Sequence, residues 1–212
     1  MPDRALARPR LLLLALPLAG GIGLLVYVLV GLSLPLAMAV TGVLGMAALA
    51  GMLTRASASD RRALRERLRV GFGAGLLATL AYDLVRFLAV RAFAFTFWPF
   101  ESFEIFGRLI VGGRLPPPWP LAVGTLYHFF NGIGFAVAFV LLVRRPGLWS
   151  GLLWAMCLEG LMVAIYPAWL RIRSLEQFLV VSVLGHAVWG SVLGIVAGRA
   201  VGQPRHAEAS GR

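Results

Sequence analysis

The chain has 212 residues, of which 59% are apolar and only 14% are charged, and its mean hydropathy is +0.84. Soluble chains average about 45–50% apolar and about 25% charged residues, so this composition excludes disorder, a coiled coil and an ordinary soluble domain. All 20 basic residues are arginine, nine residues are acidic, and the net charge is +11. The single cysteine, Cys157, excludes an internal disulfide framework and a Cys-rich zinc site. We therefore expect an all-α, polytopic bundle of transmembrane helices.

Six apolar stretches are long enough to cross a membrane, because about 20 apolar residues span roughly 30 Å of hydrocarbon. In chain order they cover 11–30, 34–53, 70–90, 121–143, 148–170 and 178–197. The first stretch follows three arginines, as a signal peptide would, but it continues without a polar cleavage region, so we expect a retained span. The first two spans then form an N-terminal hairpin over 1–53, joined by a tight turn.

The arginines are distributed unequally between the two ends of this bundle. Fourteen fall at the end that carries both termini, six of them in the segment 54–69, and five fall at the other end. This bias predicts that both termini, the basic loop 54–69 and the tail 199–212 are cytoplasmic. Because topology alone accounts for the basic charge, we expect membrane lipids and no nucleic acid as partners.

The outer segment 91–120, between the third and fourth spans, is rich in Phe and Trp, which is typical of membrane–water interfaces. Ser102 is expected to cap a short helix that runs to about Val111 and is ended by Gly112 and Gly113. This helix would lie across the outer mouth as an interfacial or re-entrant helix. Glu101, Glu104 and Arg108 share one face of it. That face is either the solvated side of an amphipathic helix or a lid with an acidic port.

An acid-bearing span followed by a His-bearing span occurs twice in the chain. Asp83 and Glu159 each come eight residues after the glycine of a Gly-Leu-Leu phrase, and His128 and His186 each begin a His-x-x-x-Gly phrase. We therefore divide the core 70–198 into two parallel repeats, which are related by an axis along the membrane normal. The repeats cover 70–143 and 148–198, and the outer segment is an insertion in the first.

The four ionisable residues of this repeat should occupy one layer of the membrane, roughly 10–17 Å below its outer edge at 1.5 Å per residue. A charge at that depth costs at least a few kcal/mol, so the side chains should face inward and find each other. The expected supporting residues on the same helix faces are Arg86, Thr79, Asn131, Ser182 and Trp189.

Several chemistries fit two imidazoles and two carboxylates. They could hold Zn²⁺, Mn²⁺ or Fe²⁺, relay protons or ions, or form only an interhelical hydrogen-bond network. Haem between His128 and His186 is a weaker option, because it leaves the carboxylates unused. No P-loop, nucleophile elbow, zincin or Rossmann pattern occurs, so no standard soluble-enzyme chemistry is indicated.

Three phrases carry a family resemblance: Tyr127-His128 running into Phe135-Ala136-Val137, Leu148-Trp149 with Gly151-Leu152-Leu153, and Gly185-His186-Ala187-Val188-Trp189. Together they resemble the YagU-like bacterial inner-membrane proteins, over spans three to six. The resemblance implies a location in the bacterial inner membrane and a role for both histidines. In that family the position of Glu159 can be an amide, which argues against a four-ligand metal site.

We therefore expect a small membrane protein whose site of His128, His186, Asp83 and Glu159 binds a divalent metal or conducts protons or ions. One alternative is a non-catalytic accessory subunit of a larger membrane complex, or a homo-oligomer, docked through the first two spans. Another is an intramembrane enzyme that acts on a lipid or a quinone. An elongated apolar cavity that reaches the histidines would favour the enzyme, whereas a narrow polar channel would favour transport.

Overall fold

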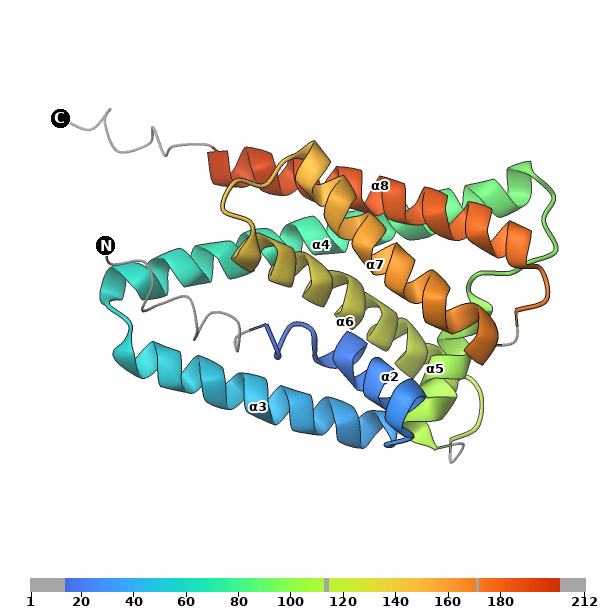
Figure 1. Cartoon of the computed structure of the whole chain (residues 1–212), viewed down its shortest axis with the longest axis horizontal. Helices are drawn as coiled ribbons and strands as arrows, with labels where there is room; N and C mark the ends of the chain where they lie inside the picture. Colours follow the sequence, from blue (N-terminus) through green and yellow to red (C-terminus); the bar gives the residue numbers. More distant parts are fainter. Residues whose placement is uncertain (1–13, 113–114, 171, 203–212) are drawn as a thin grey trace.

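The computed structural model describes residues 14–112, 115–170 and 172–202, and its regular elements there are all α-helices (Figure 1). In chain order these are α2 (Ala19–Val30), α3 (Leu34–Arg55), α4 (Ala58–Ala92), α5 (Glu101–Val111), α6 (Trp119–Leu142), α7 (Leu148–Trp169) and α8 (Leu175–Gly202).

Five of these helices, α3, α4, α6, α7 and α8, are long and apolar enough to cross a membrane. The chain is therefore a helical membrane protein, as its composition predicts. The sixth expected span is not formed within the described residues. Its helix there is α2, whose 12 residues reach only about 18 Å, and the start of that apolar stretch, 11–13, lies outside the described residues.

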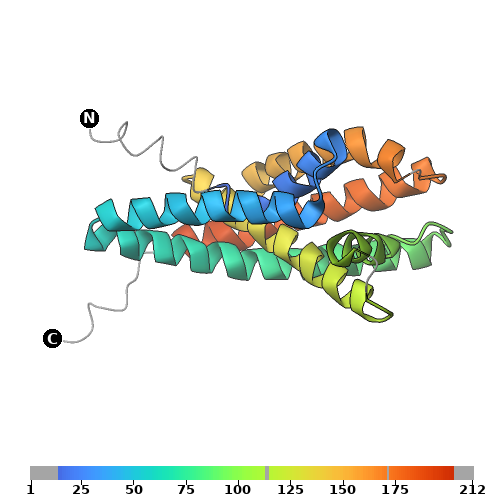
Figure 2. The same cartoon turned by 90° about the horizontal axis from the view of Figure 1, so that it is seen from below.

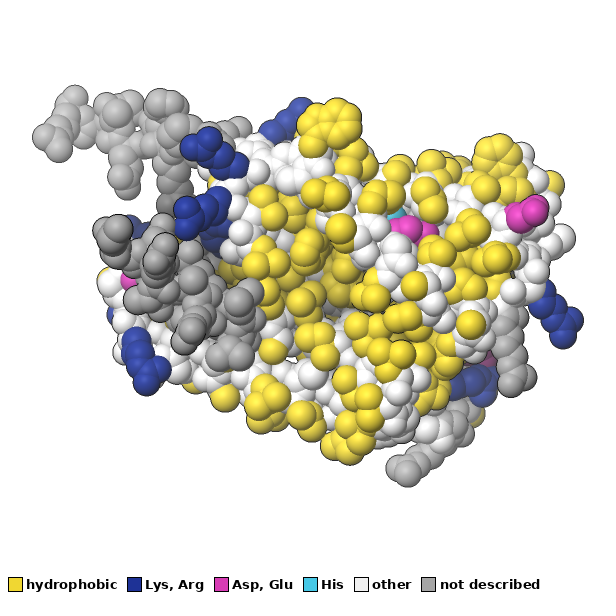
Figure 3. Space-filling model, in the orientation of Figure 1, with side chains coloured by type: hydrophobic (Ala, Val, Ile, Leu, Met, Phe, Trp, Pro, Cys, Tyr) yellow, Lys and Arg dark blue, Asp and Glu magenta, His cyan; other side chains and the backbone are white. Residues whose placement is uncertain are grey.

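The chain passes back and forth between two ends of the bundle (Figures 1 and 2). The α3–α4 and α6–α7 connections and the last turn of α8 lie at one end, which we call the basic end, and α5 lies at the other, which we call the α5 end. Arginine side chains gather at the basic end, while hydrophobic side chains cover the middle of the surface (Figure 3). This apolar middle is the surface that lipid would cover.

The basic segment 54–69, expected as a loop, is instead helical from Ala58 onward and forms the first turns of α4. A capping box starts the helix: Ser57 Oγ accepts from the backbone N–H of Asp60 at 3.1 Å, and the Asp60 carboxylate accepts from the backbone N–H of Ser57 at 3.3 Å. The charge pattern indicates a polar segment correctly, but a polar segment can also extend a helix beyond the hydrocarbon.

The core of the bundle consists of α4, α6, α7 and α8. Helix α4 packs against both α6 and α8, and α7 packs against α8. Small residues and a few large ones fill the centre, including Ala78, Ala136, Phe139 and Leu193, all fully buried. The hairpin of α2 and α3 lies beside this core, where α2 contacts α6.

The outer segment contains the expected short helix, α5. It ends at Gly112, which adopts the left-handed conformation (φ 64°) that glycine favours. It begins at Glu101, so Ser102 lies inside the helix and is not its cap; the Ser102 hydroxyl donates to the carbonyl of Pro99 at 2.9 Å. Helix α5 lies against the start of α6.

Candidate functional site

Glycines bring α4 and α6 close together one to two helical turns away from Asp83 on α4 and His128 on α6. A Cβ built on Gly75 would lie 2.7 Å from the Cβ of Ala136, and one built on Gly132 would lie 2.2 Å from Thr79 Oγ1. Neither position has space for a larger side chain, so the glycines set the distance between the two helices.

The same register occurs between α7 and α8. A Cβ on Gly151 would lie 2.8 Å from Gly194 Cα, and one on Gly190 would lie 2.6 Å from the Cβ of Ala155. Each residue stands at the same offset from its acid or histidine as its counterpart between α4 and α6. The two helix pairs are therefore packed in equivalent ways, as the duplicated sequence phrases suggest.

Asp83 of α4 and His128 of α6 form the first acid–His pair. Asp83 Oδ2 lies 3.1 Å from His128 Nε2, and Asp83 Oδ1 lies 3.3 Å from Arg86 Nη1. Because an ionised carboxylate only accepts hydrogen bonds, Nε2 of the imidazole carries the hydrogen. The ring of Phe103 on α5 lies against the same imidazole, with ring centroids 4.5 Å apart.

Glu159 of α7 and His186 of α8 form the second pair. Glu159 Oε2 lies 2.8 Å from His186 Nδ1 and accepts from the Ser182 hydroxyl at 2.9 Å. The carbonyl oxygen of Ser182 lies 3.0 Å from the same imidazole nitrogen. Both neighbours of Nδ1 are acceptors, so Nδ1 carries the hydrogen. Glu159 is only 4% exposed, and its Oε1 has no hydrogen-bond partner among the described residues.

The structure thus brings the four predicted residues together as two pairs and not as one cluster. The ring of Tyr82 lies next to both imidazoles, with centroids 5.9 Å from His128 and 5.0 Å from His186. Within the described ranges no three His, Cys, Asp or Glu side chains gather in a way that could hold a metal ion. The expected four-ligand metal shell is therefore not formed by this arrangement.

The predicted tether, Arg86, is 7% exposed and does pair with Asp83. Its Nη2 also donates to the carbonyl of Pro99 at 3.0 Å, and its guanidinium carbon lies 4.5 Å from the ring centre of Tyr82. The guanidinium therefore holds the outer segment down onto α4, a role that the sequence did not suggest. Its Nε is buried and finds no acceptor in the part of the chain that the structure describes.

The other supporting residues have more modest roles. Trp189 Nε1 donates to Thr79 Oγ1 at 3.4 Å, which links α8 to α4. Ser182 binds Glu159 directly, as expected for a neighbour of the second pair. Asn131 lines the cavity described below, and its Oδ1 is buried without a partner in residues 14–112, 115–170 and 172–202.

The predicted lid residues divide into two kinds. Glu104 and Arg108 pair with each other on the exposed face of α5, which matches the solvated-face alternative. Glu101 is also exposed but lines the cavity, near its rim with Arg173. The amide oxygen of Gln177, on α8, accepts from the backbone N–H of Phe97 at 2.9 Å and fastens the outer segment to the second repeat.

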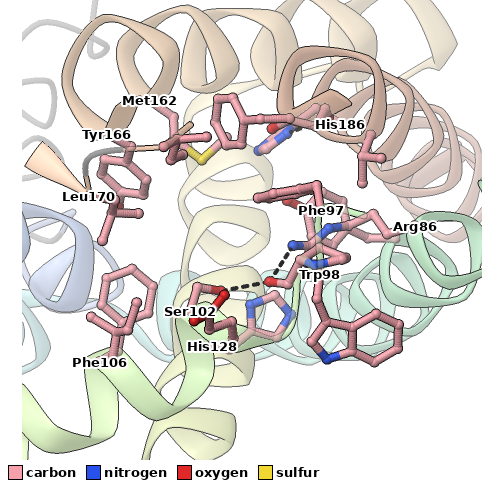
Figure 4. Close-up of a pocket in the computed structure, with 18 of the residues that line it drawn as sticks. Arg86, Phe97, Trp98, Ser102, Phe106, His128, Met162, Tyr166, Leu170 and His186 are labelled. Atoms are coloured by element: carbon pink, nitrogen blue, oxygen red, sulfur yellow. Dashed lines mark hydrogen bonds between the residues drawn. The ribbon is translucent and has the colours of Figure 1, made fainter. Parts of the chain in front are cut away.

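One cavity of about 500 Å³ lies between α4, α5, α6, α7 and α8 and reaches both imidazoles. Figure 4 shows Arg86, His128 and His186 along one side of it, and Phe106, Tyr166 and Leu170 along the other. Ligand sites are typically 300–1,000 Å³ and mostly apolar with a few convergent polar groups. This cavity has both properties.

Three residues of the site were missed by sequence reasoning: Tyr82, Phe103 and Gln177. Tyr82 lies in an apolar stretch and Phe103 in the aromatic-rich outer segment, where packing is the ordinary role of such residues, and Gln177 directly precedes the last expected span. Only Tyr82 carried a usable signal, because it precedes Asp83 and lies four residues before Arg86 on the same helix.

A family of unknown function, DUF6789, matches residues 65–208 of the chain. The chain belongs to this family, which covers the two acid–His pairs and most of the four core helices. No curated protein and no solved structure matches the chain. The resemblance to the YagU-like proteins stays a prediction.

Proposed function

We propose that this protein binds an amphiphilic molecule dissolved in the membrane, with the polar head of the molecule at the two imidazoles. The observation that carries the proposal is the two-sided cavity, which has a polar wall of Arg86, His128 and His186 opposite an apolar wall of aromatic and aliphatic side chains. A site for a bare ion would need a narrow polar path, whereas this space accommodates a drug-sized molecule.

The acid–His pairs support a binding role, because each carboxylate fixes the orientation of one imidazole. A carboxylate behind a histidine holds the ring and its tautomer in place, as acids that bind the histidines of metal and catalytic sites do. The polar groups are therefore already oriented before a ligand binds, so binding does not lose the free energy of ordering them.

The aromatic side chains at the apolar wall also form the boundary between the cavity and the helix α2. Phe106, Tyr166 and Trp169 contact one another, and Trp169 reaches Tyr27 on α2 with ring centroids 5.9 Å apart. We propose that the apolar tail of the bound molecule lies along this wall.

The test is to identify what the purified protein carries. A Met162→Trp variant fills the apolar wall of the cavity, and Leu161→Trp adds the same bulk to an adjacent residue of α7 that is 47% exposed. Organic extracts of the wild type and of the Leu161→Trp control should contain the same small amphiphile, at a molar ratio to protein near one. The extract of Met162→Trp should lack it. Equal extracts from all three proteins would contradict the proposal.

Proton relay is a second candidate, favoured by the two largely buried acid–imidazole pairs, whose imidazoles line one cavity. Proteoliposomes that report internal pH would test it. Asp83→Asn and Glu159→Gln should abolish proton flux if the pairs carry protons, and flux no faster than in empty liposomes for the wild type would rule the relay out.

For the placement in the cell we propose a bacterial inner membrane with both termini in the cytoplasm, six spans, and α5 as an interfacial or re-entrant helix. The arginine excess at the basic end supports the orientation. The amphipathic sequence of α5 and its exposed ion pair support an interfacial position. Docking of the α2–α3 hairpin onto a larger complex stays a prediction.

A further inference from the structure

We infer that the head group of the bound amphiphile is an aromatic diol, that is, a hydroquinone with a membrane-soluble tail. This inference rests on the proposed binding function and names the chemical class of the ligand. It follows from the hydrogen-bonding groups that the site leaves unused.

Each imidazole presents an acceptor to the cavity. His128 uses Nε2 and His186 uses Nδ1 to donate to its carboxylate. The other nitrogen of a neutral imidazole then carries a lone pair and accepts. No hydrogen bond from a described residue occupies either of these nitrogens. The site therefore has two unused acceptors, one on α6 and one on α8, which can bind two donors of a ligand.

Two unpaired buried atoms belong to residues that line the cavity. Asn131 Oδ1 is an acceptor and Arg86 Nε is a donor, and neither has a partner within the described residues. A hydroxyl group donates one hydrogen bond and accepts others, so a molecule with two hydroxyls matches this mixture. A phosphodiester or a carboxylate offers acceptors only and would face the imidazole lone pairs.

The charge of the polar wall also disfavours an anionic head. The positive charge of Arg86 is already balanced by Asp83 at 3.3 Å and engaged by the Pro99 carbonyl. Arg173, the other cation that lines the cavity, is exposed at its rim. A neutral head group therefore fits the depth of the cavity better than a phosphate does.

The side chains around the polar wall favour a flat ring. Tyr82 lies against both imidazoles, and Phe97 and Trp98 of the outer segment line the cavity. Aromatic faces and edges pack well on another aromatic ring. A hydroquinone ring would use these faces, and its tail would follow the wall of Phe106 and Tyr166 toward the hydrocarbon.

The test compares three uncharged probes on the full chain in lipid nanodiscs: a decyl-substituted hydroquinone kept reduced under nitrogen, the corresponding quinone, and dioctanoylglycerol. Titration calorimetry, with empty nanodiscs subtracted, gives each affinity. We expect the hydroquinone to bind about tenfold more tightly than the quinone, because the quinone leaves buried acceptors unpaired.

Variants identify the groups that cause this preference. His128→Phe and His186→Phe should each weaken hydroquinone binding about fivefold, the effect of one hydrogen bond, and should reduce the preference over the quinone. Leu126→Phe places the same ring on α6 at a residue that is 71% exposed, and it should bind like the wild type. Circular dichroism confirms that each variant is folded.

The outcomes separate this inference from the proposed function. Equal affinity for the hydroquinone and the quinone would overturn the inference, and so would unchanged binding in both histidine variants. Binding of dioctanoylglycerol without the hydroquinone would also overturn it, while the binding function itself stands. Failure of all three probes, together with extracts that hold no amphiphile, would overturn both.

Discussion

The contact between α5 and α6 gives the sharpest prediction about the framework of the site. A Cβ built on Gly124 would lie 1.6 Å from the carbonyl oxygen of Phe103, and one built on Gly107 would lie 1.7 Å from the carbonyl oxygen of Pro120. The obstructing atoms belong to the backbone on both sides, so no side-chain rotation can make room. Gly124→Ala must therefore move the two helices apart.

The size of this effect follows from the geometry. Carbon–oxygen contacts are about 3.3 Å at their closest, so α5 and α6 must separate by about 1.7 Å. Overpacking of a well-packed interface costs typically 1–3 kcal/mol. Because the backbone here cannot yield, we expect Gly124→Ala to lower the free energy of unfolding by about 3 kcal/mol. For a chain of this length each kcal/mol lowers the melting temperature by about 2–4 °C, so we expect a decrease of about 6–12 °C.

Thermal unfolding in detergent, followed by near-ultraviolet circular dichroism, measures this decrease. Gly73→Ala and Gly160→Ala are matched controls, because a Cβ at either position meets nothing within 4 Å. Both controls should melt at or above the wild-type temperature, since Ala favours a helix over Gly by up to about 1 kcal/mol. If Gly124→Ala melts together with these controls, α5 does not lie against α6 as described.

Three further predictions concern the pairs, the outer segment and the orientation. Glu159→Ala removes the acceptor of the Ser182 hydroxyl and of His186 Nδ1, both on α8. It should lower the free energy of unfolding by about 3 kcal/mol, more than Glu159→Gln does. Equal melting temperatures of the two variants would contradict the pair of Glu159 and His186. Gln177→Ala releases two groups of the outer segment, so stopped-flow measurements should show faster release of the cavity ligand, and an unchanged rate would argue that the segment does not limit exchange. In a Cys157→Ala background, an impermeant maleimide should label Leu115→Cys in intact cells and Ser59→Cys only after lysis, and the reverse labelling would invert the proposed orientation.

The pairing of acids with histidines was predictable because an acid-bearing helix followed by a His-bearing helix occurs twice in the sequence. One buried acid and one buried histidine in separate helices carry little information about contact. Asp83 with His128 and Glu159 with His186, each at the same distance from a packing glycine, predict that the two helices of each pair meet in one register. The glycines supply the physical reason, since they allow the backbones to approach closely.

The separation of the two pairs was not predictable from the same pattern. Helical spacing shows which residues share a face, but it does not show which faces meet. The ring of Tyr82 lies beside both imidazoles only because α4 packs against α8 as well as α6. For the same reason the cavity could not be anticipated in the sequence, since its walls come from five helices.

The cavity itself follows from a departure from the duplication. If the two helix pairs were fully equivalent, α7 would approach α6 as closely as α8 approaches α4, and the centre would be filled. Trp189 binds Thr79 across the α8–α4 contact. On the opposite side Trp154 and Phe139 meet with ring centroids 6.2 Å apart, and beyond them, toward the α5 end, the cavity separates Met162 of α7 from Phe135 of α6.

The outer segment accounts for this difference, because only the first repeat contains it. It supplies α5, which lies against the start of α6, and it is anchored by Arg86 and by Gln177, one from each repeat. A duplicated framework thus provides two matched hydrogen-bonding groups, and a single insertion covers the space between them. The two imidazoles therefore lie on one cavity, which the outer segment covers except at the rim, where Glu101 and Arg173 are exposed.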